Sequence, residues 1–446
     1  MLSKLSMTVL VTSTINLFFV DVDTVSAQNS GVAGQDSIAE HIKGMEERLE
    51  ALEGAVDGRG KNGHGNSKMS LHGRIHLDYW AFPKNDSGID TIEEQNPQDR
   101  FAFRRVRLGV KGDVGDNVFY RITIEFANPN STEYRDIFFG IQKVPFFQKV
   151  QIGNQKRPYS LLQLNSSNAN VFIERPFIAD ATQQDTRRIG IQSWSVSANQ
   201  AWNWQYCIFN RENTQNDGRY LSDNYQLEAA GRLAGTVYYD KESGGRNYAH
   251  LGIAGSIGWT DEDGDPASNT ARLRSRPEAR STKRWLDTGA ISGSDNLYLL
   301  GLEGLYNMGP FQVAGEFMNV RVKREPHPNV NFWGAYAYAS YFLTGEHIPW
   351  SRKTGTLGTI SPKRNLSKSR SALQAGVRYS YANFNSNDVL GGEGKSLTFG
   401  LNWWWNPNTR VQFNYIHGEI INRLVISHGN TSGAYDIIGT RFMIYF

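Results

Sequence analysis

The stretch VRLGVKGDVGDNVFYRITIEFA, residues 106–127, contains two segments in which apolar and polar side chains alternate. In residues 106–114, valine and leucine alternate with charged residues and glycine, and residues 118–127 show the same alternation. Since successive side chains of a β-strand point to opposite faces of a sheet, a period of two predicts two antiparallel strands. The turn-forming residues Gly115–Asn117 would join them as a hairpin.

The same alternation recurs along the chain, for example at residues 71–82 and 373–381. No long amphipathic helix interrupts these segments, and about sixteen of them follow one another, most of about 9–13 residues. Alternation alone also fits a soluble β-sandwich. Strand length, aromatic residues at strand ends such as Trp403–Trp405, and a final strand ending on Phe446 favour a membrane barrel. The predicted fold is an all-β, sixteen-stranded antiparallel transmembrane barrel.

The composition agrees with such a barrel. The chain of 446 residues is polar on average, with 20% charged residues, 44 glycines and a mean hydropathy of −0.49. No run of about 18 apolar residues follows residue 30, so no helical membrane span is predicted there. The single cysteine, Cys207, excludes an intrachain disulfide and a multi-cysteine metal site. The net charge of +3 gives no basis for nucleic-acid binding.

The segment before the predicted barrel divides into three parts. Residues 1–27 carry a lysine, an apolar core and small residues at a cleavage position, which predicts an export signal peptide, with an uncleaved anchor helix as the alternative. Residues 28–57 have apolar residues at heptad spacing and predict a periplasmic coiled coil, or else a helix lying against the barrel. Residues 58–70 are rich in glycine and asparagine and predict a flexible linker. The barrel then occupies residues 71–446.

Loop lengths test this topology, because outer-membrane barrels alternate long outer loops with short periplasmic turns. Long outer connections are predicted at residues 83–100, 156–187, 260–295 and 383–396. Residues 344–370 are also long, yet the strand count assigns them to the side of the short turns. Either the count is off, or this segment folds into or under the barrel.

Residues 71–446 resemble the phosphate-selective porin family (porins O and P) of bacterial outer membranes. The resemblance is carried by HGR (72–74), FRRVRLGVKG (103–112), IGNQKRPYSLLQLNSSNANVFIER (152–175), YFLTGE (341–346), RYS (378–380), GLNWWWNPN (400–408) and RFMIYF (441–446). It implies a homotrimer of sixteen-stranded barrels in outer-membrane lipid. Each barrel would be a channel for phosphate or similar small anions, narrowed by an inward-folded third outer loop that matches residues 156–187.

The resemblance also implies roles for individual residues. The positions that match the phosphate-binding constriction are Arg104, Arg105, Arg175, Ser166 and Ser167, with Asp136 as an acidic neighbour and Arg74 as a lumenal arginine. A lysine expected in the constriction loop is Gln163 here, which removes one positive charge. Arginine suits such a site because its forked donors match the oxygens of a tetrahedral anion.

Three further predictions concern cations. Alternation predicts lumen-lining roles for Arg107, Lys111, Arg121, Arg232 and Arg378. Consecutive residues of a regular strand face opposite sides, so Arg104 and Arg105 cannot both point inward, and Arg104 is expected at the junction with a loop. The basic run at residues 272–284 falls on an outer loop, where it is either solvated, bound to lipid headgroups or an anion-collecting funnel.

Other functions find less support in the sequence. An outer-membrane enzyme such as a lipase would need a Ser–His pair at a lipid-facing strand edge, and neither this pair nor a nucleotide-binding motif is found. His72 and His76 would lie about 13 Å apart on a strand, too far to share a metal. No enzyme activity, cofactor or metal is therefore predicted. The open alternatives are an envelope-tethering barrel plugged by residues 156–187 and 344–370, and a general porin for other anions.

Overall fold

The computed structural model describes residues 67–182, 186–212, 226–260, 271–366 and 369–446. The predicted signal peptide, the coiled-coil segment and residues 58–66 of the linker lie outside the described residues, so these predictions stay open.

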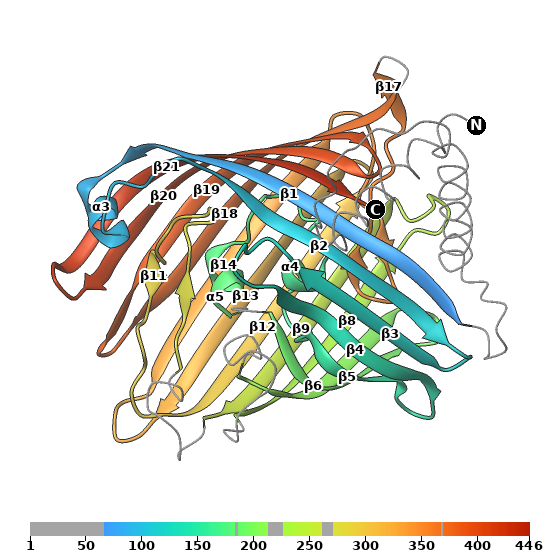
Figure 1. Ribbon diagram of the computed structural model, residues 1–446, viewed down its shortest axis with the longest axis horizontal. Coiled ribbons are helices and arrows are strands. Elements are labelled where there is room, and N and C mark those ends of the chain that lie inside the picture. The colour runs from blue at the N-terminus through green and yellow to red at the C-terminus, as the bar shows by residue number, and fades with distance from the viewer. Residues whose placement is uncertain (1–66, 183–185, 213–225, 261–270, 367–368) are drawn as a thin grey trace, which may run out of the picture. The chain divides into compact units, whose positions relative to one another are not determined.

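The described residues form a closed antiparallel barrel of sixteen strands, as predicted (Figure 1). Each strand pairs with its neighbours in sequence, and the barrel closes where the first strand pairs with the last, from Arg74 opposite Tyr445 to Asn85 opposite Tyr435. The strands are β1 (Lys68–Asn85), β2 (Arg100–Val114), β3 (Val118–Glu125), β4 (Glu133–Val144), β5 (Gln148–Lys156), β6 (Arg187–Val196), β7 (Trp202–Asn210), β8 (Leu227–Tyr239), β9 (Asn247–Trp259), β12 (Ser294–Met308), β13 (Phe311–Arg324), β14 (Val330–Phe342), β18 (Ser369–Ser386), β19 (Val389–Asn406), β20 (Thr409–Val425) and β21 (Gly429–Tyr445).

Shorter elements lie in the connections. They are the helices α3 (Ser87–Glu93), α4 (Leu161–Leu164) and α5 (Phe177–Thr182), the strand pairs β10 (Arg274–Ser275) with β11 (Leu286–Asp287) and β15 (Trp350–Ser351) with β16 (Thr356–Leu357), and β17 (Arg364–Leu366), which pairs with the start of β18. No helix in the described ranges is both long and apolar enough to cross a membrane.

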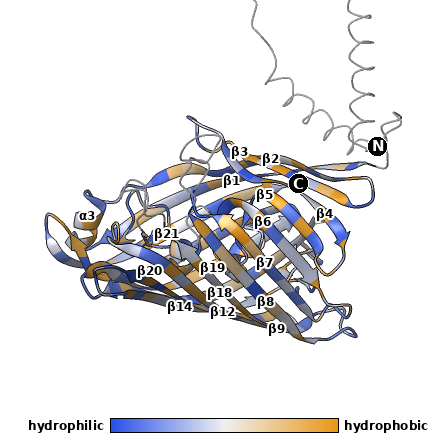
Figure 2. Cartoon of the chain, turned by 90° about the horizontal axis from the view of Figure 1, so that it is seen from below, coloured by the Kyte–Doolittle hydropathy of each residue, from blue (hydrophilic) through white to orange (hydrophobic). Residues whose placement is uncertain are grey.

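The two faces of the strands separate as the alternation predicts. On β19, the outward side chains of Leu397, Phe399 and Trp403 are 36–49% exposed, whereas the inward side chains of Thr398 and Asn402 are fully buried. Figure 2 shows hydrophobic and hydrophilic residues alternating along the strands that face the viewer. The apolar outer face suits lipid, and the polar inner face encloses the lumen.

The connections divide the barrel into a turn end and a loop end. The turn end carries short connections at residues 115–117, 145–147, 197–201, 240–246, 309–310 and 407–408, and the loop end carries long ones at 86–99, 157–186, 211–226 and 260–293. The predictions of long loops at 83–100, 156–187 and 260–295 are therefore confirmed in outline.

The predicted long loop at 383–396 is wrong. β18 and β19 continue through this region and turn at Asn387 and Asp388. The glycines of this region, Gly391, Gly392 and Gly394, lie within β19. A Cβ on Gly394 would come within 2.9 Å of Leu286 and 3.1 Å of Phe177, so glycine here makes room for segments that fold into the barrel.

Three connections fold into the lumen, two from the loop end and one from the turn end. From the loop end come residues 157–182, with α4 and α5, and residues 271–293, whose Trp285 is fully buried. From the turn end comes the 343–363 segment, in which Trp350 donates from Nε1 to Thr236 Oγ1 at 2.9 Å. The second explanation for residues 344–370, folding into the barrel, is therefore the correct one for the described part.

Candidate functional site

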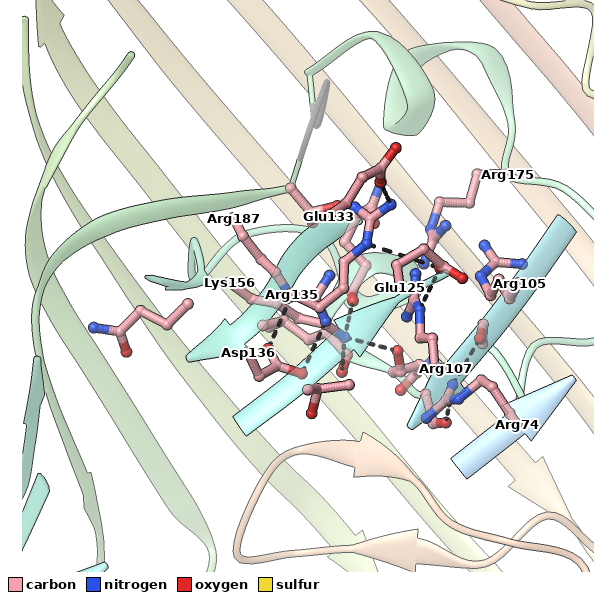
Figure 3. A pocket seen from close by; sticks show the side chains of 18 of the residues that line it. Arg74, Arg105, Arg107, Glu125, Glu133, Arg135, Asp136, Lys156, Arg175 and Arg187 are labelled. Carbon is pink, nitrogen blue, oxygen red and sulfur yellow. Dashed lines mark hydrogen bonds and ion pairs between the residues drawn. The ribbon is translucent and has the colours of Figure 1, made fainter. Parts of the chain in front are cut away.

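A cavity of about 780 Å³ lies in the lumen between β1–β7 and the inserted segments (Figure 3). Eleven arginines and one lysine line it among the described residues, against four carboxylates. The cations are Arg74, Arg104, Arg105, Arg107, Arg121, Arg135, Arg175, Arg187, Arg276, Arg280, Arg284 and Lys156, and the carboxylates are Glu125, Glu133, Asp136 and Asp180. The cavity therefore carries a surplus of positive charge.

A β-bulge places two consecutive arginines of β2 in this cavity. His76 of β1 pairs with Arg105, but the next residue, Leu77, pairs with Phe103, so Arg104 is the extra residue of the bulge. Both arginines line the cavity. The expectation that Arg104 lies at a loop junction is therefore wrong, because a bulge breaks the strict alternation inside the strand.

A second bulge does the same on β4. Ile122 of β3 pairs with Ile137, whereas Ile124 pairs with Tyr134, so two residues of β4 stand opposite Thr123. These two are Arg135 and Asp136, and both line the cavity. Each bulge turns both members of a pair of consecutive residues toward the lumen. The two bulges therefore bring four charged side chains to the lumen, whereas regular strands would bring two.

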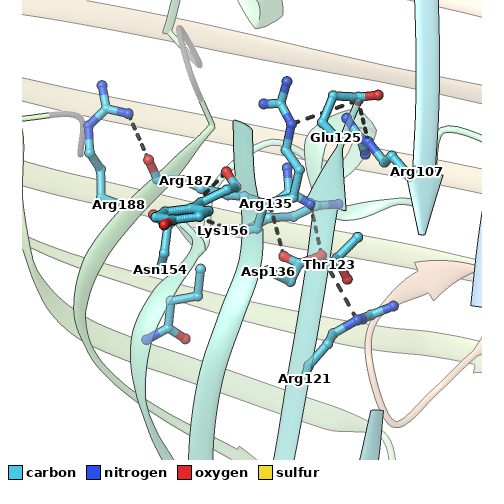
Figure 4. Close-up of polar contacts among 12 residues, drawn as sticks. Arg107, Arg121, Thr123, Glu125, Arg135, Asp136, Asn154, Lys156, Arg187 and Arg188 are labelled. Carbon is cyan, nitrogen blue, oxygen red and sulfur yellow. Dashed lines mark hydrogen bonds and ion pairs between the residues drawn. The ribbon is translucent and has the colours of Figure 1, made fainter. Parts of the chain in front are cut away.

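Six of the eleven cavity arginines lie within 4.0 Å of a described carboxylate, and Figure 4 shows the contacts of Arg107 and Arg187 among them. Arg187 binds Asp136 through two hydrogen bonds of 2.8 and 3.0 Å, and Arg107 Nε donates to Glu125 at 2.6 Å. Arg135 pairs with Glu133, and Arg284 Nη1 lies 3.0 Å from Asp180. Arg121 reaches Asp136 only at 4.0 Å. In these pairs the arginine's charge is largely compensated.

Arg104 is also paired, with a carboxylate of the inserted loop. Its Nε and Nη2 donate to the two oxygens of Glu174 at 2.8 and 3.2 Å. Burial alone would raise the pKa of the Glu174 carboxyl, but the charges of Arg104 and Arg441 outweigh it and hold that pKa well below its usual value. Glu174 therefore stays ionised and keeps Arg104 in place.

Four other arginines form no ion pair within the described part of the chain. Arg105 is 4% exposed, donates to His76 Nδ1 at 3.3 Å and keeps a buried Nε without a partner. Arg74 donates to Ser167 at 2.8 Å and to Ser166 at 3.4 Å. Arg175 Nε donates to the Leu162 carbonyl at 3.2 Å, and Arg276 Nε to a backbone carbonyl at 3.0 Å.

Arg280 likewise forms no ion pair in these ranges. The Arg104 charge, together with burial, lowers the pKa of Arg280 to about 9, so its guanidinium is still charged at neutral pH. Burial is the main reason that the pKa of Arg175 falls to about 10. The lowered pKa of Arg280 reflects the like charge of Arg104, and a region with several cations favours the entry of an anion.

The sequence singled out the basic run 272–284 but left its role open, whereas Arg135 and Arg187 were not predicted to line the cavity. Arg276, Arg280 and Arg284 belong to the basic run 272–284, which folds inward instead of remaining solvated. Its first member, Arg272, stays half exposed and pairs with Asp287. The basic run 272–284 was the sequence feature that pointed to these cations, but whether it folds into the lumen depends on its contacts with other loops.

Two predicted positions differ from the rest. Lys111 lies on the inward face of β2 nearer the turn end and does not line this cavity. Gln163 is buried and donates to the Ala179 carbonyl at 3.1 Å. A lysine does lie beside it, because Lys156 Nζ donates to the Gln163 carbonyl at 2.5 Å.

Most of the predicted site residues lie around one cavity, and Lys111 lies outside it. Those that line the cavity are Arg74, Arg104, Arg105, Arg107, Arg121, Asp136, Ser166, Ser167 and Arg175.

No group of three metal-ligating side chains occurs in the described ranges. His72 is hydrogen-bonded to Thr123 at 3.0 Å, and His76 to Asn168 at 3.2 Å, each across to a different element. Cys207 is buried and donates to a backbone carbonyl.

Comparison with known families identifies the barrel. The family model described as phosphate-selective porin O and P matches residues 69–446. A protein of Caulobacter vibrioides described only as uncharacterized is 27% identical over 86% of this chain and 75% of its own length. Porin O of Pseudomonas aeruginosa is 22% identical over 30% of this chain and 32% of its own length.

Solved structures of outer-membrane proteins share this fold. The trimer form of OmpT from Vibrio cholerae has a TM-score of 0.52 at 12% identity, covering 85% of this chain and 99% of that one. The anion-selective porin from Comamonas acidovorans has a TM-score of 0.51 at 12% identity, covering 85% and 100%. At this identity the likeness concerns the fold.

Proposed function

The chain belongs to the phosphate-selective porin O and P family of the bacterial outer membrane, and on this premise we propose that the cavity is the constriction of a passive, phosphate-type anion channel. Inorganic phosphate or a similar oxyanion would be held by the unpaired cations and then released toward the periplasm. Such a channel must bind its ion strongly enough to attract it and weakly enough to let it leave.

The observation that carries the proposal is Arg105. Its guanidinium is 4% exposed and lines the cavity, yet none of the described carboxylates pairs with it. Burying an unpaired charge costs several kcal/mol, by the order of magnitude known for buried ions, unless a counter-ion arrives. A small oxyanion supplies both the charge and the acceptor oxygens that Arg105 lacks.

The other predicted residues have complementary roles in this proposal. Arg74 and Arg175 add unpaired cations, and Ser166 and Ser167 offer hydroxyls beside Arg74 without adding charge. Asp136 pairs with Arg187 and so limits how strongly the cavity attracts an anion. Arg104, Arg107 and Arg121 lie close to carboxylates and shape the field around the site.

Planar-bilayer recordings test the proposal. The single-channel chloride current should show anion selectivity and should fall when inorganic phosphate is added. Arg105→Ala and Arg175→Ala should each weaken this block by about tenfold or more, the size of one lost charge-assisted hydrogen bond. Lys323→Ala, which removes an exposed cation of the loop end paired with Asp295, should leave the block unchanged. A permeability ratio near one, or an unchanged block in both arginine variants, would contradict the proposal.

The assembly and the N-terminal parts complete the proposal. A homotrimer is supported by the resemblance and by the fold shared with the trimer form of OmpT, an outer-membrane protein. We further propose that residues 1–27 are a signal peptide and residues 28–57 a periplasmic coiled coil joined by a linker. Cross-linking in native membranes would test the trimer, and its loss on deletion of residues 28–57 would test the coiled coil.

A plugged structural barrel is the second candidate, because two segments inserted from opposite ends meet in the lumen. Leu357 of the 343–363 segment donates to Asn165 Oδ1 of the 157–182 loop at 2.9 Å. An absence of measurable conductance in folded protein would favour this candidate. Block by phosphate of a measurable chloride current would exclude it.

A further inference from the structure

The helix α4 carries little stabilisation of its own at its first turn. It has four residues, and its N-cap residue Ser160 has a φ of 67° and makes no capping hydrogen bond with its side chain. The first backbone N–H groups of a helix have no partner within the helix, so buried ones must be satisfied from elsewhere. Leu161 and Leu162 are 1% and 5% exposed, which excludes water as the main partner.

A carboxylate of the barrel wall supplies these partners. Glu316 of β13 accepts the N–H of Leu161 at 3.1 Å and the N–H of Leu162 at 3.0 Å, one with each oxygen. It also accepts a hydrogen bond from the Tyr336 hydroxyl. Glu316 is 4% exposed and forms no ion pair with any described cation. A buried carboxylate without a cation is costly, and this one is compensated by the loop it holds.

The opposite end of α4 is held by a cation. Lys156, the last residue of β5, donates from Nζ to the carbonyls of Gln163, Leu164 and Asn165 at 2.5, 3.1 and 3.1 Å. The last carbonyls of a helix lack partners as the first N–H groups do, and they favour positive charge. α4 is thus clamped between a carboxylate and an ammonium group from two different strands.

The clamp connects to the cavity through the residues that α4 positions. The Leu162 carbonyl accepts the hydrogen bond from Arg175 Nε, so the residue held by Glu316 also orients an unpaired cavity arginine. Ser166 and Ser167 follow α4 after Asn165, and both accept a hydrogen bond from Arg74. A shift of α4 would move all of these groups relative to one another.

We propose that Glu316 is a positioning residue of the constriction: through the Leu161 and Leu162 N–H groups it fixes α4 and thereby sets the geometry of Arg175, Ser166 and Ser167. Lys156 fixes the other end of the same helix. This inference rests on the proposed function, because it assigns Glu316 a role in anion binding. Glu316 does not line the cavity and so does not touch the anion.

The direction in which Glu316→Gln changes phosphate block distinguishes a positioning role from a purely electrostatic one. Removing a negative charge near an anion site strengthens anion binding by Coulomb's law alone. Glu316→Gln removes that charge but also replaces one acceptor oxygen by an NH₂ group that faces a backbone N–H. If Glu316 positions α4, phosphate block of the chloride current at pH 8 weakens, by about tenfold for the loss of one charge-assisted hydrogen bond.

Glu133→Gln is the matched control. It makes the same chemical change at a carboxylate that lines the cavity and pairs with Arg135. It leaves Arg135 with only the more distant Glu125, 3.8 Å away, so phosphate block should become stronger. Opposite signs for the two Glu→Gln variants support the proposal, whereas a block that is equal to wild type or stronger in Glu316→Gln overturns it.

Two further measurements keep the test decisive. Glu316→Asp keeps the charge but shortens the side chain, so it should weaken the block less than Glu316→Gln and serves as the test if the Gln variant does not fold. Folding is checked by heat-modifiable migration in detergent gels. If wild-type channels show no phosphate block at all, the proposed function fails. If wild type is blocked and both Glu316 variants are blocked as strongly, only the positioning role fails.

Discussion

The wall formed by β1–β6 and the wall formed by β18–β21 both carry inward arginines, but they use them differently. On β18–β21, the guanidinium groups of Arg378, Arg410 and Arg441 are at most 1% exposed and bind the inserted loops. Arg378 and Arg410 donate to loop carbonyls at 2.9–3.3 Å, and Arg441 binds Asp78 and Glu174. On β1–β6, most arginines instead line the cavity, namely Arg74, Arg104, Arg105, Arg107, Arg121, Arg135 and Arg187.

The difference shows that an inward position does not define an arginine's role. An arginine covered by a loop donates its hydrogen bonds to protein groups and serves as an anchor. An arginine that faces the cavity without a carboxylate keeps charge and donors available for an ion. Arg232, predicted as a lining residue, is an anchor by this criterion, because it binds Glu303 and donates to the Gly355 carbonyl of the turn-end insertion. Arg378 is an anchor in the same way.

The largest effect is expected from breaking an anchor. Arg441→Met would leave Asp78, which is 1% exposed, without the two hydrogen bonds of 2.7 Å that now neutralise it. Removing one partner of a buried ion pair costs about 3–5 kcal/mol in the free energy of unfolding. Urea unfolding of the refolded barrel in lipid vesicles measures this loss. The exposed pair offers the control, since Lys323→Met should cost less than about 1 kcal/mol. Equal midpoints for Arg441→Met and wild type would show that Arg441 is no anchor.

Substitutions in the cavity wall should change the binding of phosphate rather than the stability of the barrel. Arg105 has no carboxylate, whereas the charge of its neighbour Arg104 is compensated by Glu174. Arg105→Gln should therefore weaken phosphate block by about tenfold, and Arg104→Gln by no more than about threefold. The two variants alter adjacent residues of one bulge, so each is the control of the other. A larger effect from Arg104→Gln would reverse the distinction between paired and unpaired arginines.

The sequence predicted the outer face of the barrel much better than the inner one. Alternation identified the lipid-facing residues of β1, β18 and β19, because lipid imposes one simple requirement on every outward side chain. The resemblance led to the constriction loop and to Arg104, Arg105 and Arg175. Family, barrel fold and outer-membrane location are confirmed, whereas the roles of the site residues stay predictions.

The lumen could not be predicted in detail for physical reasons. A bulge adds one residue to one strand, and neither the Arg104–Arg105 pair nor the Arg135–Asp136 pair carries a local signal that distinguishes a bulge from regular pairing. The inward course of residues 271–293 depends on distant contacts such as Glu93, which accepts from Trp285 Nε1 at 2.7 Å. Gly394 likewise makes room within β19 for Phe177 and Leu286, a tertiary contact that the sequence does not show.

A substitution with a smaller expected effect tests whether an anchor arginine also influences conductance and phosphate block. Arg410 donates to the carbonyls of Asn168 and Val171 in the 157–182 loop, and its guanidinium lies 4.2 Å from the Trp404 ring centroid. Arg410→Met should loosen this part of the loop, raise the chloride conductance and weaken phosphate block by about threefold, the size of one ordinary hydrogen bond. Single-channel recording gives both values. If block weakens while conductance stays constant, Arg410 contributes its charge rather than its hold on the loop.

The smallest effect is expected at the turn-end insertion, where a histidine lies beside two cations. Burial, together with the charges of Arg246 and Lys363, lowers the pKa of His347 to about 4 from its usual 6.5. The folded segment therefore binds the proton less readily than the unfolded one, and its stability falls as pH drops from about 6.5 toward 4. Because the side chain is only half buried, the loss should stay within about 1 kcal/mol. Chloride-current fluctuations should increase when the turn-end solution is acidified from pH 7 to 4.5, and His347→Gln should remove that increase. If the fluctuations grow equally in His347→Gln, another group is responsible for the response to acid.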